Sequence, residues 1–142
     1  MQGGLVPSLL MSAGVTLLCF ALHAVFIAMG AAVVRAAAKG MGPFRFLRET
    51  AMFFFLAVLL SIAHGAEVGV WALAYQAIGF ETFEEALYFA AVSYTTLGYG
   101  DVLPPEGWGL TAGAAAASGL LLFGFSAAFM LDAYMRLRVL RW

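Results

Sequence analysis

The chain has 142 residues, of which 64% are hydrophobic and 11% are charged, and its formal net charge is -1. Soluble domains carry about a quarter charged residues, so this composition excludes a soluble domain and indicates a membrane protein. A near-neutral charge also provides no basic surface for nucleic acid.

Three apolar runs follow one another along the chain, from Leu5 to Val34, from Ala51 to Tyr75 and from Trp108 to Tyr134. About 20 apolar residues cross the hydrocarbon of a bilayer, so each run predicts a transmembrane helix. Little sequence lies outside these runs, and we therefore expect no soluble ligand-binding domain. None of the runs carries the periodic arginines of a voltage sensor.

Basic residues gather at two places, and the positive-inside rule assigns both to the cytoplasm. They are Arg35, Lys39, Arg45, Arg48, Arg136, Arg138 and Arg141. In the inner membrane of a cell, we expect an external N-terminus and a cytoplasmic C-terminus. The basic cytoplasmic segments would be a loop from Arg35 to Arg48, turning at Pro43, and a tail from Arg136 to Trp142.

Residues 81–105 are too few and too polar to span a bilayer, so they should enter and leave on the outer side. Thr82 and Glu85 have the spacing of a capping box, which predicts that a helix starts there. From Phe83 to about Tyr94 this helix would be roughly 18 Å long, about half the hydrocarbon thickness. The negative end of its dipole would stabilise a cation near the membrane centre.

The five residues from Thr96 to Gly100 can bind such a cation as extended backbone. Gly98 and Gly100 take positive φ without steric cost, so successive carbonyls can point the same way. Four such loops around an axis would stack rings of carbonyl oxygens, with the Thr96 hydroxyl as the innermost ring. The motif is not repeated within the chain, so each chain supplies one loop.

The segment Thr95–Asp101, TTLGYGD, resembles the signature of pore-loop potassium channels, with leucine where valine is more usual. Residues 86–89 fall where those channels have paired aromatics on the pore helix, and Trp108 where they open the inner helix. Residues 64–129 are similar to small bacterial members of the two-helix ion-channel group. Members of that group are expected to carry an acidic residue before the inner-helix glycine, and residues 114–117 supply none.

The resemblance implies an all-α membrane protein with three transmembrane helices, a re-entrant pore helix and a selectivity-filter loop, assembled in lipid as a homotetramer. Residues 1–49 would form an extra N-terminal helix and basic loop, and residues 50–142 the ion-channel pore domain. Potassium would be held by the carbonyls of Thr96, Leu97, Gly98 and Tyr99, beside Gly100. No cofactor besides the permeant ion and no enzyme activity are expected.

Six residues around the filter are expected to support it: Thr95, Asp101, Val92, Tyr88, Phe89 and Trp108. Val92 matches a position where some members of the family carry a glutamate paired with the filter aspartate. Asp101 therefore needs another partner, and we expect Tyr88 to be that partner.

Further residues have alternative interpretations. Gly119 and Gly124 are expected either to form a gating hinge or to let helices pack closely, as small residues do in membranes. Phe123 or Met130 would narrow the inner pore as a hydrophobic gate, or be ordinary apolar residues. Asp132 is spaced for an i,i+4 ion pair with Arg136, and the alternative is an acidic ring at the inner mouth.

Ionisable residues inside a membrane usually face protein or water. His64 and Glu67 share a helix face, and His23 lies at a similar depth on the preceding helix, so the three should meet. Either they make a polar contact between helices or they form a proton sensor, because histidine titrates near neutrality.

The sequence therefore favours a potassium-selective channel that conducts passively. One alternative is a weakly selective cation channel, and another is a non-conducting accessory or sensing membrane subunit.

Overall fold

The computed structural model describes residues 3–38 and 45–139. Within these residues all the regular secondary structure is helical, without strands, and the four helices are α1 (Leu5–Ala38), α2 (Arg45–Ile78), α3 (Phe83–Tyr94) and α4 (Gly109–Val139). Helices α1, α2 and α4 are long and apolar enough to cross a membrane. The predicted all-α class with three transmembrane helices is confirmed, and the chain is a multi-pass membrane protein.

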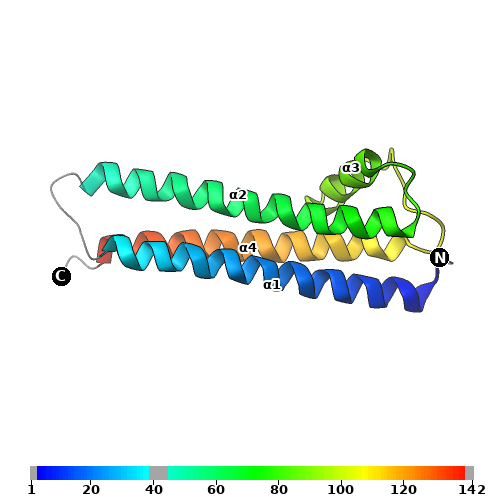
Figure 1. Cartoon of the computed structure of the whole chain (residues 1–142), viewed down its shortest axis with the longest axis horizontal. Helices are drawn as coiled ribbons and strands as arrows, with labels where there is room; N and C mark the ends of the chain where they lie inside the picture. Colours follow the sequence, from blue (N-terminus) through cyan, green and yellow to red (C-terminus); the bar gives the residue numbers. More distant parts are fainter. Residues whose placement is uncertain (1–2, 39–44, 140–142) are drawn as a thin grey trace.

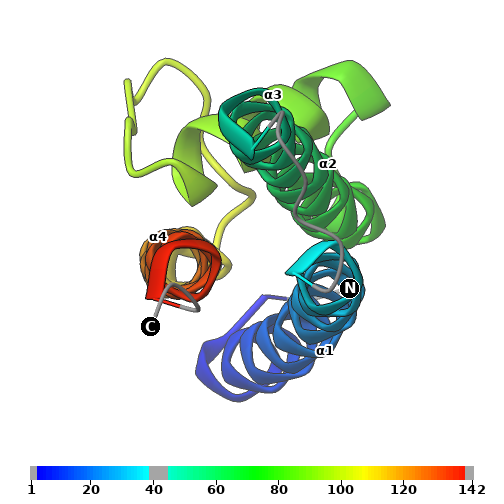
Figure 2. The same ribbon diagram turned by 90° about the vertical axis from the view of Figure 1, so that its left-hand side faces the viewer.

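The three long helices lie side by side as a bundle, with α1 packed against both α2 and α4. The short helix α3 packs against α2 and α4 at the end where α1 begins (Figure 1). Seen along the bundle, α3 and the segment that follows it project on the side of α2 and α4 away from α1 (Figure 2). The start of α1, α3 and the loop before α4 therefore share one end of the molecule.

The long helices extend further than the apolar runs predict. Because α1 ends at Ala38 and α2 begins at Arg45, Arg35 and Arg48 lie on helices rather than in a loop. The predicted turn at Pro43 lies outside the described residues. The 34 residues of α1 span about 51 Å, well beyond the ~30 Å of hydrocarbon, so charged residues at its end can stay helical in the interface.

The expected C-terminal tail is corrected in the same way. Helix α4 continues to Val139, so Arg136 is helical and not part of an extended tail. The domain boundary expected at residue 50 falls inside α2. A hydrophobicity pattern locates the membrane-embedded part of a helix, whereas backbone hydrogen bonds continue the helix into the polar interface.

Aromatic packing holds α3 on α2. Tyr75 of α2 lies 4.8 Å from the ring of Phe89 on α3, and Phe80 lies 5.1 Å from the same ring. Tyr75 also donates a hydrogen bond to the carbonyl of Thr111, the third residue of α4. Phe89, one of the expected filter supports, is therefore a buried contact between α3 and its neighbours.

Candidate ion-conduction site

Helix α3 starts as the capping box predicts. Thr82 is the N-cap, and its hydroxyl oxygen accepts a 3.1 Å hydrogen bond from the Glu85 amide. The helix ends at Tyr94, and the Thr95 hydroxyl donates to the Ala91 carbonyl at 2.7 Å. Its 12 residues span about 18 Å, which is half the hydrocarbon thickness. The helix is therefore too short to span the membrane and has the length of a re-entrant helix.

The segment after α3 turns back on the helix end and then alternates in backbone conformation. The Thr96 amide donates to Ser93 and the Gly98 amide to Val92, both at 3.0 Å. Every second residue is left-handed, with φ of 62° at Thr96, 50° at Gly98 and 76° at Gly100. The two glycines were expected to permit this, but the conformation of Thr96 was not foreseen, because a β-branched residue rarely takes positive φ.

Tyr88 and Asp101 form the contact expected from the sequence. The Tyr88 hydroxyl donates a 2.6 Å hydrogen bond to Oδ2 of Asp101, whose Oδ1 accepts from the Val102 amide at 3.1 Å. The hydrogen bond from Tyr88 holds the pKa of the Asp101 carboxyl below its usual range. It raises the pKa of the Tyr88 hydroxyl for the same reason. The pair ties the end of the TTLGYGD segment to the pore helix.

Gly119 of α4 lies directly against the end of α3. A Cβ built on this glycine would be 2.0 Å from the carbonyl oxygen of Tyr94, so no side chain fits. At Gly124 a Cβ would meet nothing within 4 Å. For Gly119 these distances favour close helix packing over a gating hinge. For Gly124 they favour neither interpretation.

The loop before α4 is held by the N-terminal helix. Ser8 of α1 donates a 2.7 Å hydrogen bond to the carbonyl oxygen of Gly107. Gly107 has φ of 83°, and a Cβ on it would be 2.6 Å from the carbonyl carbon of Gly3. Trp108, the next residue and an expected filter support, is buried at the start of α4. Contact between α1 and this loop was not predicted from the sequence.

A comparison with known families bears on this arrangement. The family described as "Ion channel" matches residues 66–136, which is half of the chain. The match includes α3, the TTLGYGD segment and most of α4.

The chain belongs to this family of pore-loop ion channels. Neither a curated protein nor a solved structure matches it. The family is one of ion-transporting membrane proteins rather than enzymes, and the match begins near the middle of α2. Helix α1 lies outside the matched residues.

Behind its pore loop, this ion channel contains a polar network drawn from all four helices. Glu67 accepts hydrogen bonds from Nδ1 of His23 at 2.8 Å, from Nδ1 of His64 at 3.0 Å and from the Tyr94 hydroxyl. The Ser126 hydroxyl lies 2.9 Å from Nε2 of His64 and 3.3 Å from Nε2 of His23. The predicted meeting of His23, His64 and Glu67 is thus confirmed as a contact, and their predicted proton sensing stays a prediction.

Sequence reasoning missed two members of the network, Tyr94 and Ser126. Ser126 lies ten residues before the basic Arg136 on its helix, and His23 lies twelve residues before the basic Arg35. Counting residues from the basic ends, which placed the two histidines at similar depth, therefore also places Ser126 near them. Tyr94 gave no such signal, because the turn of α3 toward α2 depends on aromatic packing.

His23, His64 and Glu67 offer ligand atoms within 4.8 Å of one another, the composition of a metal site. However, the histidine–carboxylate distances of 2.8 and 3.0 Å are hydrogen-bond lengths. Ligands around a tetrahedral zinc ion stand about 3.4 Å apart, so the group fits a shared-proton network better than a metal centre.

The residues expected at a gate lie on α4 of this channel. The ring of Phe123 is 4.3 Å from that of His64 and 5.6 Å from that of Tyr94, so it flanks the polar network. Met130 is partly buried. Arg136 donates a 2.6 Å hydrogen bond to Asp132, and both side chains are at least half exposed, which is the expected surface ion pair.

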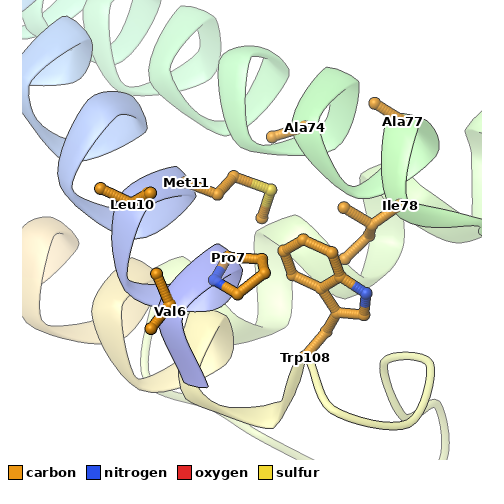
Figure 3. A pocket seen from close by; sticks show the side chains of 8 residues that line it. All are labelled: Val6, Pro7, Leu10, Met11, Ala74, Ala77, Ile78 and Trp108. Atoms are coloured by element: carbon orange, nitrogen blue, oxygen red, sulfur yellow. The ribbon is translucent and has the colours of Figure 1, made fainter. Parts of the chain in front are cut away.

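An apolar cavity of about 490 Å³ opens between the start of α1 and the end of α2. Figure 3 shows Pro7 and Met11 of α1 facing Trp108, with Ile78 of α2 beside its indole. The described residues that line the cavity carry no ionisable group, so the cavity provides apolar contacts only.

Proposed function

We propose that the chain is the subunit of a potassium-selective channel in which four copies surround one pore. The observation that carries this proposal is the alternating left-handed backbone of Thr96, Gly98 and Gly100 directly after a re-entrant helix. Alternation of left-handed and ordinary residues lets successive carbonyls face one side of the strand. Carbonyl rings of this kind can replace the hydration shell of potassium.

The surroundings of the loop support the same proposal. The carbonyls at the end of α3 carry the negative end of its dipole toward the base of the loop, where they favour a cation. Residues 95–101 are exposed in the single chain, as expected for a segment that other copies complete. Ions would be bound by Thr96, Leu97, Gly98 and Tyr99, next to Gly100, and would pass down their electrochemical gradient without any cofactor.

The remaining assignments follow from this proposal. The loop opens to the outside, the start of α1 lies on the same side, and the basic ends of α1 and α4 face the cytoplasm. Residues 50–142 supply the pore, and residues 1–49 add a helix to its periphery.

The test is the reversal potential of the purified full-length protein in a planar bilayer, with potassium on one side and sodium on the other. A value close to the potassium equilibrium potential supports the proposal. A value near zero indicates a weakly selective cation channel, and absence of current from a folded homotetramer indicates an accessory subunit.

A pair of glycine variants links the current to the filter. Gly98→Ala forces a side chain onto a residue with φ of 50° and is expected to abolish selective current. Gly65→Ala, on α2, places a Cβ where nothing lies within 4 Å and is the matched control. Equal currents from the two variants would contradict the assignment of the filter.

A further inference from the structure

Two contacts place α1 at both ends of the pore loop. At the end of the loop, Ser8 donates to the carbonyl of Gly107. At its beginning, His23 bonds to Glu67, which accepts a hydrogen bond from Tyr94, the last residue of α3. In the described part of the chain α1 does not pack directly on α3, so the second connection depends on side chains alone.

The hydrogen bonds of the network fix the number of its protons. An ionised carboxylate only accepts, so the contacts of Glu67 with His23 and His64 are both hydrogen bonds only when Nδ1 of each histidine carries hydrogen. Ser126 has a single hydroxyl hydrogen and therefore donates to Nε2 of only one histidine. The other Nε2 must carry a proton and donate to the serine oxygen. If all of these hydrogen bonds form at once, the network holds one proton more than two neutral imidazoles and an ionised Glu67 carry. The number of protons in the network stays the same if this extra proton moves from a histidine to Glu67.

This proton count also balances the charge. His23 is 1% exposed and Glu67 and Tyr94 are 0% exposed, so an uncompensated charge here would be costly. With one added proton the network is neutral. Without it, a negative charge is left in the protein interior, and the Ser126 oxygen faces an unprotonated nitrogen.

The titratable groups that face Glu67 come from three helices. They are His23 and Cys19 of α1, His64 of α2 and Tyr94 of α3. Helix α4 contributes Ser126, which does not titrate near neutrality. The two histidines are therefore the groups of the network that can carry the added proton.

Tyr94 links the protonation of this network to the filter. Its side chain is held by Glu67 and His64, and its carbonyl oxygen lies against Gly119, where no Cβ fits. Thr96, the first left-handed residue of the loop, follows two positions later. Tyr94 therefore connects the network to the base of the filter through two residues of backbone.

We propose that His23, Glu67 and Tyr94 are positioning residues of the pore, and that their network, while it holds one shared proton, fixes the filter in its conducting geometry. This inference rests on the proposed role of residues 96–100 as the filter. It gives the N-terminal helix, which lies outside the family match, a part in conduction.

The first test is the pH profile of potassium current from the full-length channel in bilayers between about pH 6 and pH 9. Wild-type current is expected to fall as pH rises, because the network then loses its added proton. In His23→Asn, whose amide cannot take up a proton and lacks the Nε2 that faces Ser126, and in Glu67→Gln, the pH-dependent part is expected to be lost. Ser12→Ala is the matched control, because this buried hydroxyl of α1 has no hydrogen-bond partner among the described residues.

A flat wild-type profile, or a wild-type profile retained by both His23→Asn and Glu67→Gln, overturns the proposal while leaving potassium conduction intact. The second test needs no current. Hydrogen–deuterium exchange of residues 95–101 is compared at one pH in wild type, His23→Asn, Tyr94→Phe and Ser12→Ala.

Loss of a buried hydrogen bond is expected to speed exchange in this loop about tenfold in His23→Asn and Tyr94→Phe, but not in Ser12→Ala. Unchanged exchange in His23→Asn excludes the coupling of α1 to the loop, whatever ion the channel conducts. The exchange result therefore decides the positioning role even if the reversal potential contradicts potassium selectivity.

Discussion

The Tyr88 hydroxyl lies 2.6 Å from Oδ2 of Asp101, thirteen residues later in the chain. This hydrogen bond joins the middle of the pore helix to the residue that ends the TTLGYGD segment. It restrains the loop at its C-terminal end, while the contact between Tyr94 and Gly119 restrains it at its N-terminal end.

Removal of the Tyr88 hydroxyl is expected to loosen the C-terminal end of the loop. We predict that Tyr88→Phe lowers the potassium-to-sodium permeability ratio by up to about tenfold, which moves the reversal potential by about 59 mV toward zero. Asp101→Asn keeps an acceptor for Tyr88 and should cause a smaller shift. A reversal potential in Tyr88→Phe equal to that of wild type would show that the bond does not support selectivity.

The same hydrogen bond predicts the titration of Asp101. Because it lowers the pKa of this carboxyl, the bond is fully present above the ordinary aspartate pKa and is lost as pH falls through the lowered value. The carboxyl carbon resonance of Asp101 should therefore titrate at a lower pH in wild type than in Tyr88→Phe. Coinciding midpoints would mean that the bond is not formed in solution.

Contact between Gly119 and Tyr94 predicts a severe effect from one added methyl group. Gly119→Ala would place a Cβ 2.0 Å from a backbone oxygen, so α4 or the end of α3 must move. Overpacking of this kind costs about 1–3 kcal/mol, and we expect a lower unfolding temperature in detergent together with loss of current. Gly124→Ala, with open space at the Cβ within the chain, should be much less affected, and the reverse order would refute close packing at Gly119.

The ion pair of Asp132 and Arg136 predicts a null effect on conduction. Both side chains are at least half exposed, and the pair follows the ordinary i,i+4 spacing of a helix surface. Single-channel conductance of Asp132→Asn at low salt should equal that of wild type. A clear reduction would instead support an acidic ring at the inner mouth of the pore.

Local sequence signals predicted the pore helix to the residue. Thr82 caps the first turn and Tyr94 ends the helix, as the capping box and the length of the segment indicated. Capping depends on residues within one turn, so it can be predicted from the sequence alone. The ends of α1, α2 and α4 were less predictable, because hydropathy changes at the membrane boundary and the helices continue beyond it.

The polar network was predictable only in part. Depth counting brought His23, His64 and Glu67 together, since residues at equal height on neighbouring helices can meet. It could not identify Tyr94 as the third donor to Glu67, because this contact depends on how α3 leans on α2 through Phe89 and Tyr75.

Sequence by itself determined the membrane class, the three spans, the re-entrant helix and the TTLGYGD loop, because composition, hydropathy and capping are local properties of the chain. Tertiary structure alone decided that α1 reaches both ends of the pore loop, through Ser8 and through His23. It also decided that Gly119 must be a glycine and that Thr96 is left-handed. The contacts of Ser8, His23 and Gly119 depend on the distance between segments far apart in the chain, which packing sets and no local pattern encodes.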